Sequence, residues 1–163
     1  MKDIIAVCPG SFDPITIGHL DIISRCSTMF SKVIVVVLQN ATKKSSSFTV
    51  GERIEMIKKS TASLDNVEVD SFDGLLADYA AMKNATAIVK GLRAVTDFEY
   101  EFQMALTNKK LNPEVETIFL TTSAENMYLS SSMVKQIASM GGDISDFVPA
   151  AIHNDILSRL KKN

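Results

Sequence analysis

An α/β fold with a five-stranded parallel sheet and helices on both faces is what the sequence predicts. Residues 4–8 and 33–38 are continuous apolar runs rather than alternating ones, which is typical of strands that helices cover on both sides. Segments with helical periodicity separate these runs and the later strand candidates. Alternating strands and helices in one domain give a doubly wound, Rossmann-like sheet whose strands run parallel.

Each expected element carries a local signal. The expected strands are short runs rich in apolar residues, at residues 4–8, 33–38, 67–69, 85–89 and 117–120. The expected helices share periodicity and start signals, and they begin near residues 18, 49, 96, 131 and 149. Two of these starts, Thr49 to Glu52 and Thr96 to Glu99, fit a capping box, in which a hydroxyl and a glutamate cap the first turn.

The helix that begins near residue 131 is expected to be amphipathic. Its apolar face consists of Met133, Val134, Ile137 and Met140. The pair Gly141-Gly142 should stop it, because glycine readily adopts the backbone conformation that ends a helix. A last helix is expected over residues 149–161.

Composition predicts a single domain over residues 1–163. The chain has 163 residues, of which 46% are hydrophobic, enough to build a core without disulfides or metals. The net charge of −2, with both signs well mixed, gives no electrostatic reason to bind nucleic acid or an anionic membrane. Cys8 and Cys26 should be reduced and structural. No apolar run approaches the ~18 residues of a membrane span, and we expect a cytoplasmic protein.

Ligands of doubly wound sheets bind at the carboxyl ends of the strands. The loops expected to meet at that edge are residues 9–18, 39–48, 72–75, 90–96 and 121–131. A binding site should therefore draw its residues from several of these loops.

The first loop has small residues, Gly10, Ser11 and Gly18, where a phosphate could approach the backbone. The Walker A and Gly-x-Gly-x-x-Gly patterns are both absent. Thr16 and His19 instead place a hydroxyl and an imidazole at the expected phosphate-binding edge. An imidazole at a helix N-terminus can donate a hydrogen bond to charge that develops on phosphoryl oxygens. By itself, a histidine here is more often a cap or packing residue.

The stretch from Pro9 to His19, Pro-Gly-Ser-Phe-Asp-Pro-Ile-Thr-Ile-Gly-His, resembles the T/HxGH signature of the nucleotidyltransferase superfamily. Its surroundings are similar to one family within it, the phosphopantetheine adenylyltransferases. Three further blocks carry the likeness: Lys43, Lys90 to Glu101, and Ser130 to Ser132. Four blocks in the family's order, each on an expected loop, are far more specific than any one of them.

The resemblance implies a nucleotidyltransferase-type fold and the reaction of ATP with 4′-phosphopantetheine to give dephospho-coenzyme A and pyrophosphate. The acceptor phosphate would attack the α-phosphorus in line, without a covalent enzyme intermediate. Mg²⁺ would arrive with ATP, bound mainly through phosphates and water. No dedicated metal site is expected, because no cluster of residues has transition-metal spacing. The resemblance also implies a homohexamer and coenzyme A as a feedback ligand.

The resemblance assigns roles to particular residues. The expected catalytic residues are His19, Lys43 and Arg93. The expected ATP contacts are Ser11, Phe12, His19, Gly91, Leu92, Arg93, Glu101, Asn126, Met127, Tyr128, Leu129, Ser130, Ser131 and Ser132. The expected contacts to the acceptor substrate are Ser11, Lys43, Leu76 and Lys90.

Several of these residues have simpler interpretations. Lys43 could be an exposed loop lysine, Glu101 a solvated helix residue and Leu76 a core leucine. Ser130 to Ser132 could cap the helix that follows them. The family usually has arginine where Lys90 stands, and lysine keeps the charge without the bidentate fork.

Two alternative functions stay open at this point. One is a nucleotidyltransferase with another acceptor, such as nicotinate mononucleotide or glycerol phosphate. The other is a catalytically silent nucleotide-binding protein, which would not need His19, Lys43 and Arg93. The block from Lys90 to Glu101 favours 4′-phosphopantetheine as the acceptor, and the presence of His19, Lys43 and Arg93 favours an enzyme.

Overall fold

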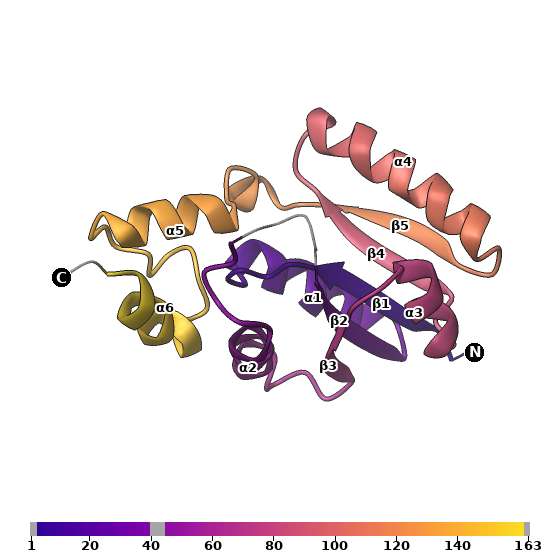
Figure 1. The fold of residues 1–163 in the computed structure, drawn as a ribbon, viewed down its shortest axis with the longest axis horizontal. Helices are drawn as coiled ribbons and strands as arrows, with labels where there is room; N and C mark the ends of the chain where they lie inside the picture. Colours follow the sequence, from indigo (N-terminus) through magenta and orange to yellow (C-terminus); the bar gives the residue numbers. More distant parts are fainter. Residues whose placement is uncertain (1–2, 40–44, 162–163) are drawn as a thin grey trace.

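Five parallel strands form the centre of the molecule, in the order β3-β2-β1-β4-β5 (Figure 1). The computed structural model describes residues 3–39 and 45–161. The strands are β1 (Ile5–Gly10), β2 (Lys32–Leu38), β3 (Val67–Phe72), β4 (Ala87–Leu92) and β5 (Glu116–Thr121). The helices are α1 (Ile17–Met29), α2 (Val50–Ser60), α3 (Leu76–Met82), α4 (Val95–Leu111), α5 (Ser131–Ser139) and α6 (His153–Leu160), with short 3-10 helices η1 (Ala124–Asn126) and η2 (Ala150–Ile152). The predicted α/β class and all five predicted strands are confirmed.

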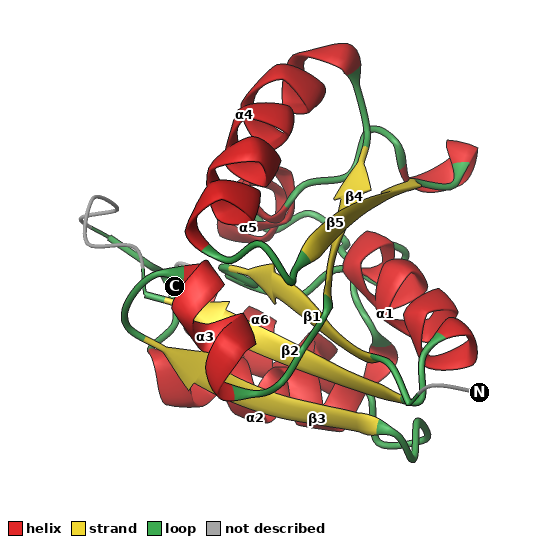
Figure 2. Cartoon of the chain, turned by 90° about the vertical axis from the view of Figure 1, so that its right-hand side faces the viewer, coloured by secondary structure: helices red, strands yellow, loops and turns green. Residues whose placement is uncertain are grey.

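Two apolar cores lie on opposite faces of the sheet, because successive strand residues point to opposite sides. Ala6 and Cys8 of β1 pack in the larger core, which includes buried side chains of α1, α2, α5 and α6. Val7 packs in the smaller one, against Tyr79 and Ala80 of α3. Figure 2 shows α2 and α3 on opposite sides of the sheet. None of the helices within residues 3–39 and 45–161 is long and apolar enough to cross a membrane.

The order of the strands reverses at β1, and this opens the sheet. β1 pairs with β2 from Ile5 to Gly10, but with β4 only at Ala6 and Val7. The carboxyl ends of β1 and β4 therefore separate beyond Val7. Such a reversal is the place where open α/β sheets bind ligands.

Helix ends explain where the predictions succeed and fail. Thr49 and Glu52 form the predicted capping box of α2, with N–H···O distances of 3.2 and 2.8 Å. The capping box predicted at Thr96 is wrong. α4 begins at Val95, and its N-cap is Ala94, without a side-chain hydrogen bond. Because the extended backbone already ends at Ala94, Thr96 lies inside the helix rather than before it.

The end of α5 agrees with the glycine signal but not with the predicted apolar face. Gly141 has a φ of +78°, and the N–H of Gly142 donates to the carbonyl of Ile137 at 2.9 Å, which is the Schellman arrangement. Met140, predicted on the apolar face, is instead 77% exposed. It is the C-cap residue, where the helical period no longer sets the direction of the side chain.

Candidate active site

A cleft of about 420 Å³ lies where the ends of β1 and β4 separate. Its walls come from both halves of the sequence: the loop after β1, the first turns of α1, the end of β4, the start of α4 and the first turn of α5. The strand order positions these segments together, although they span residues 8–132 of the chain.

Most of the predicted ATP-site residues line this cleft. Those that line it are Ser11, Phe12, His19, Gly91, Arg93, Glu101, Asn126, Leu129, Ser130, Ser131 and Ser132. Lys90, a predicted contact of the acceptor substrate, lines it as well. The others lie elsewhere: Met127 and Tyr128 are 51% and 57% exposed on the surface, and Leu92 is the last residue of β4. Leu76 begins α3 and packs against the smaller core. Lys43 lies outside the described residues.

His19 is part of the cap of α1. Thr16 is the N-cap residue, and its hydroxyl accepts the backbone N–H of His19 at 3.3 Å. In return, Nδ1 of His19 accepts the backbone N–H of Thr16 at 3.0 Å. A neutral imidazole that accepts at Nδ1 carries its proton on Nε2. The cap therefore fixes both the ring and its tautomer, and it leaves Nε2–H as the donor.

The surroundings of His19 keep the ring neutral. Burial, followed by the positive charges of Arg93 and Lys90, lowers the pKa of His19 to about 4. The ring of Phe12 packs edge-on against it, with the centroids 5.1 Å apart. At neutral pH His19 is thus a fixed hydrogen-bond donor rather than a cation.

This electrostatic arrangement can be tested by an NMR titration of the histidine rings. Wild-type His19 should titrate at about pH 4, and Arg93→Met should raise its pKa because a neighbouring positive charge is lost. Since the unfolded chain binds this proton near pH 6.5, His19 lowers the stability as the pH falls from about 6.5 to 4. Arg159→Met, on α6, is the control. A wild-type titration near pH 6.5 would contradict the assignment.

Two basic residues on the β4 side of the cleft are each paired with a carboxylate from α4. Nζ of Lys90 lies 3.2 Å from Oε1 of Glu101. Nε of Arg93 lies 3.3 Å from Oδ2 of Asp97, and its Nη1 donates to the carbonyl of Leu129 at 2.9 Å. The pairs hold both cations at the wall of the cleft, where they can exchange a carboxylate for a phosphate.

Asp97 is a residue of the cleft that sequence reasoning missed. The sequence places it in the predicted capping box and in the block from Lys90 to Glu101, but neither pattern gives it a role in the site. Its spacing, four residues before Glu101 on the same helix, is the signal that could have found it, because side chains four apart share one face of a helix.

The serines at the start of α5 combine a structural and a binding arrangement. The hydroxyl of Ser130 caps the helix by accepting the N–H of Met133 at 3.1 Å. The hydroxyl of Ser131 donates to the carbonyl of Pro14 at 2.7 Å. Backbone N–H groups at the first turn of a helix attract anions, so this end of the cleft suits phosphate oxygens.

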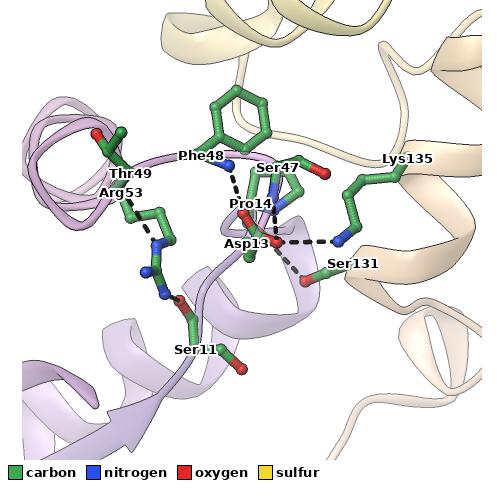
Figure 3. Close-up of polar contacts among 9 residues, drawn as sticks. All are labelled: Ser11, Asp13, Pro14, Ser47, Phe48, Thr49, Arg53, Ser131 and Lys135. Atoms are coloured by element: carbon green, nitrogen blue, oxygen red, sulfur yellow. Dashed lines mark hydrogen bonds and ion pairs between the residues drawn. The ribbon is translucent and has the colours of Figure 1, made fainter. Parts of the chain in front are cut away.

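Four polar contacts that the sequence does not predict, one buried and three partly buried, hold the loop after β1 (Figure 3). The guanidinium of Arg53, on α2, donates to the carbonyl of Ser11 at 2.8 Å. The carboxylate of Asp13 accepts the N–H groups of Ser47 and Phe48 and pairs with Lys135. The sequence carries no local signal for these contacts, because each joins residues far apart in the chain.

The two cysteines are free thiols that form no disulfide bond. Their sulfur atoms lie 3.7 Å apart, Cys8 on β1 and Cys26 on α1. The hydrogen bond to Cys26 and burial raise the pKa of the Cys8 thiol, which keeps it protonated. Across residues 3–39 and 45–161, no three His, Cys, Asp or Glu side chains are grouped so as to hold a metal ion.

Comparison with known proteins first gives the class. The family model for cytidylyltransferase-like proteins matches residues 7–137. A protein of Vibrio parahaemolyticus described as a nicotinate-nucleotide adenylyltransferase shares the fold, with a TM-score of 0.66 at 18% identity over 96% of this chain and 97% of its own. A bifunctional NMN adenylyltransferase/ADP ribose pyrophosphatase of Francisella tularensis gives a TM-score of 0.71, also at 18% identity, over 95% of this chain and 49% of its own. The family model and the shared fold place the chain among the cytidylyltransferase-like nucleotidyltransferases.

Closer relatives then give the family. The phosphopantetheine adenylyltransferase of Caldanaerobacter subterraneus subsp. tengcongensis is 57% identical over 159 residues, which is 98% of this chain and 99% of that protein. The phosphopantetheine adenylyltransferase of Clostridium botulinum is 58% identical over 157 residues, or 96% of this chain and 98% of its own. At this similarity the chain belongs to the phosphopantetheine adenylyltransferase family.

Proposed function

We propose that the protein transfers the adenylyl group of ATP to 4′-phosphopantetheine, giving dephospho-coenzyme A and pyrophosphate. Family membership supports the choice of substrates. The observation that carries the chemistry is His19, a neutral ring whose Nδ1 accepts a backbone N–H within its own cap. Such a donor is oriented before the substrate arrives, and donors of this kind stabilise charge that develops in a transition state.

The reaction needs positioning rather than a nucleophile from the protein. An oxygen of the acceptor phosphate attacks the α-phosphorus, and the bond from that phosphorus to the bridging oxygen of pyrophosphate breaks. A phosphate monoester already carries one to two negative charges at neutral pH, so no base has to remove a proton from it. Nε2–H of His19 donates to an α-phosphoryl oxygen as its charge grows.

The α5 end and the β4 side of the cleft both suit the phosphate groups of the two substrates. The first turn of α5, with Ser130 to Ser132, faces the β- and γ-phosphates of ATP, as its N–H groups favour. Lys90 and Arg93 leave their carboxylate partners to bind phosphates of the substrates. Lys43 and Leu76 stay predicted contacts of the acceptor.

Mg²⁺ enters with ATP in this proposal. The oxygens of phosphates, water and carboxylates are the ligands that this hard cation prefers, and Asp97 and Glu101 bring two carboxylates to the cleft. When bound, the ion neutralises charge on the phosphates of ATP.

The assembly and setting of the protein are further parts of the proposal. We infer a single-domain subunit that forms a homohexamer and acts in the cytoplasm. The exposure of α4 supports the assembly. Among residues 97–111 of this helix only Asn108 is buried, and five large apolar side chains are exposed: Phe98, Tyr100, Phe102, Leu106 and Leu111. The free thiols of the two cysteines suit a reducing compartment.

Coenzyme A shares the adenylate and pantetheine parts of the product. It should therefore compete with the substrates for the cleft.

A pyrophosphate-release assay tests the choice of acceptor. The protein is supplied with ATP, Mg²⁺ and either 4′-phosphopantetheine or nicotinate mononucleotide. Release is expected only with 4′-phosphopantetheine. No release with that acceptor would contradict the proposal, and release with nicotinate mononucleotide alone would favour the other acceptor class.

A further inference from the structure

Asp13 lies at the junction of three segments that are far apart in the sequence (Figure 3). The residue is 8% exposed. One carboxylate oxygen accepts the N–H of Phe48 at 2.9 Å. The other accepts the N–H of Ser47 at 3.0 Å and pairs with Nζ of Lys135 at 2.9 Å. Every contact of this carboxylate is thus made with a different element from its own.

The hydrogen bonds keep this carboxylate charged. Burial acts to raise the pKa of Asp13, but the hydrogen bonds from Lys135, Ser47 and Phe48 outweigh it and hold the pKa below its ordinary value. Among the described residues, α5 brings Nζ of Lys135 to this carboxylate, and the segment before α2 brings the backbone N–H groups of Ser47 and Phe48. The hydroxyl of Ser131 donates instead to the carbonyl of the neighbouring Pro14.

α5 meets the loop after β1 at two points on one helix face. Ser131 donates to the carbonyl of Pro14, and Lys135, four residues later, pairs with Asp13. Side chains four apart stand one above the other on a helix. Two contacts in line fix both the rotation of α5 about its axis and its distance from the loop after β1. The first turn of this helix carries the serines of the cleft.

We propose that Asp13, through its pairing with Lys135, is a positioning residue for adenylyl transfer. It holds the first turn of α5 at a fixed place relative to the loop that carries Ser11 and leads to His19. The inference rests on the proposed function and adds to it: neither residue lines the cleft, yet the pair sets how the phosphate end of the cleft faces the catalytic imidazole.

The expected effect is on turnover more than on binding. A displacement of about 1 Å within a reacting complex can cost on the order of 10²-fold in rate. Lys135→Met removes the cation at nearly constant length, and we expect it to lower kcat by at least about tenfold on that scale. The KM for ATP should rise by a smaller factor, because the groups that touch ATP are all still present.

The conservative and coupled variants separate this role from others. Lys135→Arg restores a donor to Asp13 and should recover most of the lost kcat. Asp13→Asn should lower kcat as Lys135→Met does, because an amide nitrogen would face donors. If the two side chains act as one unit, the double variant that combines Asp13→Asn with Lys135→Met should have a kcat no lower than that of the less active single variant. The control is Lys59→Met, which removes an exposed ion pair with Asp155 between α2 and α6.

The experiment measures kcat, the KM for ATP and the Tm of each variant beside the wild type. A lower Tm with kcat within about twofold of the wild type would overturn the inference, since the pair would then be structural only. A loss of kcat that Lys135→Arg does not recover would also overturn it. If Asp13→Asn fails to fold, the two Lys135 variants decide. A wild type inactive with 4′-phosphopantetheine would overturn the proposed function and this inference together, whereas an active wild type with active variants would overturn this inference alone.

Discussion

His19→Ala is expected to lower kcat by about 10²- to 10³-fold, the usual cost of removing one preorganised donor to a developing oxyanion. The Kd for ATP should change much less. The reason lies in when the contact matters: Nε2–H stabilises charge that appears only as the α-phosphorus is attacked, so its loss is felt in the transition state rather than in the ground state.

Steady-state kinetics and equilibrium ATP binding measure the two quantities separately. His153→Ala, the other histidine of the chain, is the matched control, because it lies on α6 and does not line the cleft. His19→Ala also removes the acceptor for the N–H of Thr16, so a small fall in Tm is expected. Equal losses of kcat and ATP affinity would make His19 a binding residue, and a large loss of Tm would make it structural.

The second large effect is expected on the assembly. Phe102 and Leu106 are 47% and 58% exposed, and they share one face of α4 because they are four residues apart. A carboxylate at either position would be buried without a partner in an interface, which is strongly unfavourable. Phe102→Glu combined with Leu106→Glu should therefore dissociate the proposed homohexamer.

Sedimentation velocity, or light scattering on a sizing column, measures the mass of the assembly. Met29→Glu is the control, since Met29 is 51% exposed at the end of α1, on an element that does not belong to this face. An unchanged mass in the double variant would contradict α4 as an interface. Dissociation by Met29→Glu as well would place the interface elsewhere or show a general effect of added charge.

Local patterns in the sequence were sufficient to predict the sheet and much of the cleft. The run from Val33 to Leu38 is apolar at every position because both faces of β2 are covered, and such runs identify central parallel strands. His19, Arg93 and Ser130 could be grouped in advance because each follows a strand at the same edge of the sheet. In these cases the position of a residue just after a strand predicts where it lies in the folded protein.

Contacts between distant segments could not be predicted in this way. Arg53 and Ser11 are 42 residues apart, and Asp13 and Lys135 are 122 apart. Their pairing depends on how α2 and α5 pack on the sheet, which no local pattern encodes. The predicted start of α4 differs for another reason, which is local: Thr96 and Glu99 fit a capping box, but the backbone already turns into the helix after Ala94.

The residues that line the cleft extend from Cys8 to Ser132, and this has a consequence for the chain during its synthesis. β1 and β2, with the ring of His19, are complete within the first quarter of the sequence, whereas Ser130 to Ser132 and Lys135 are added near its end. A nascent chain that stops before α5 lacks one wall of the cleft and the cation that pairs with Asp13. Activity should therefore appear only late in synthesis, after α5 has left the ribosome and completed the cleft.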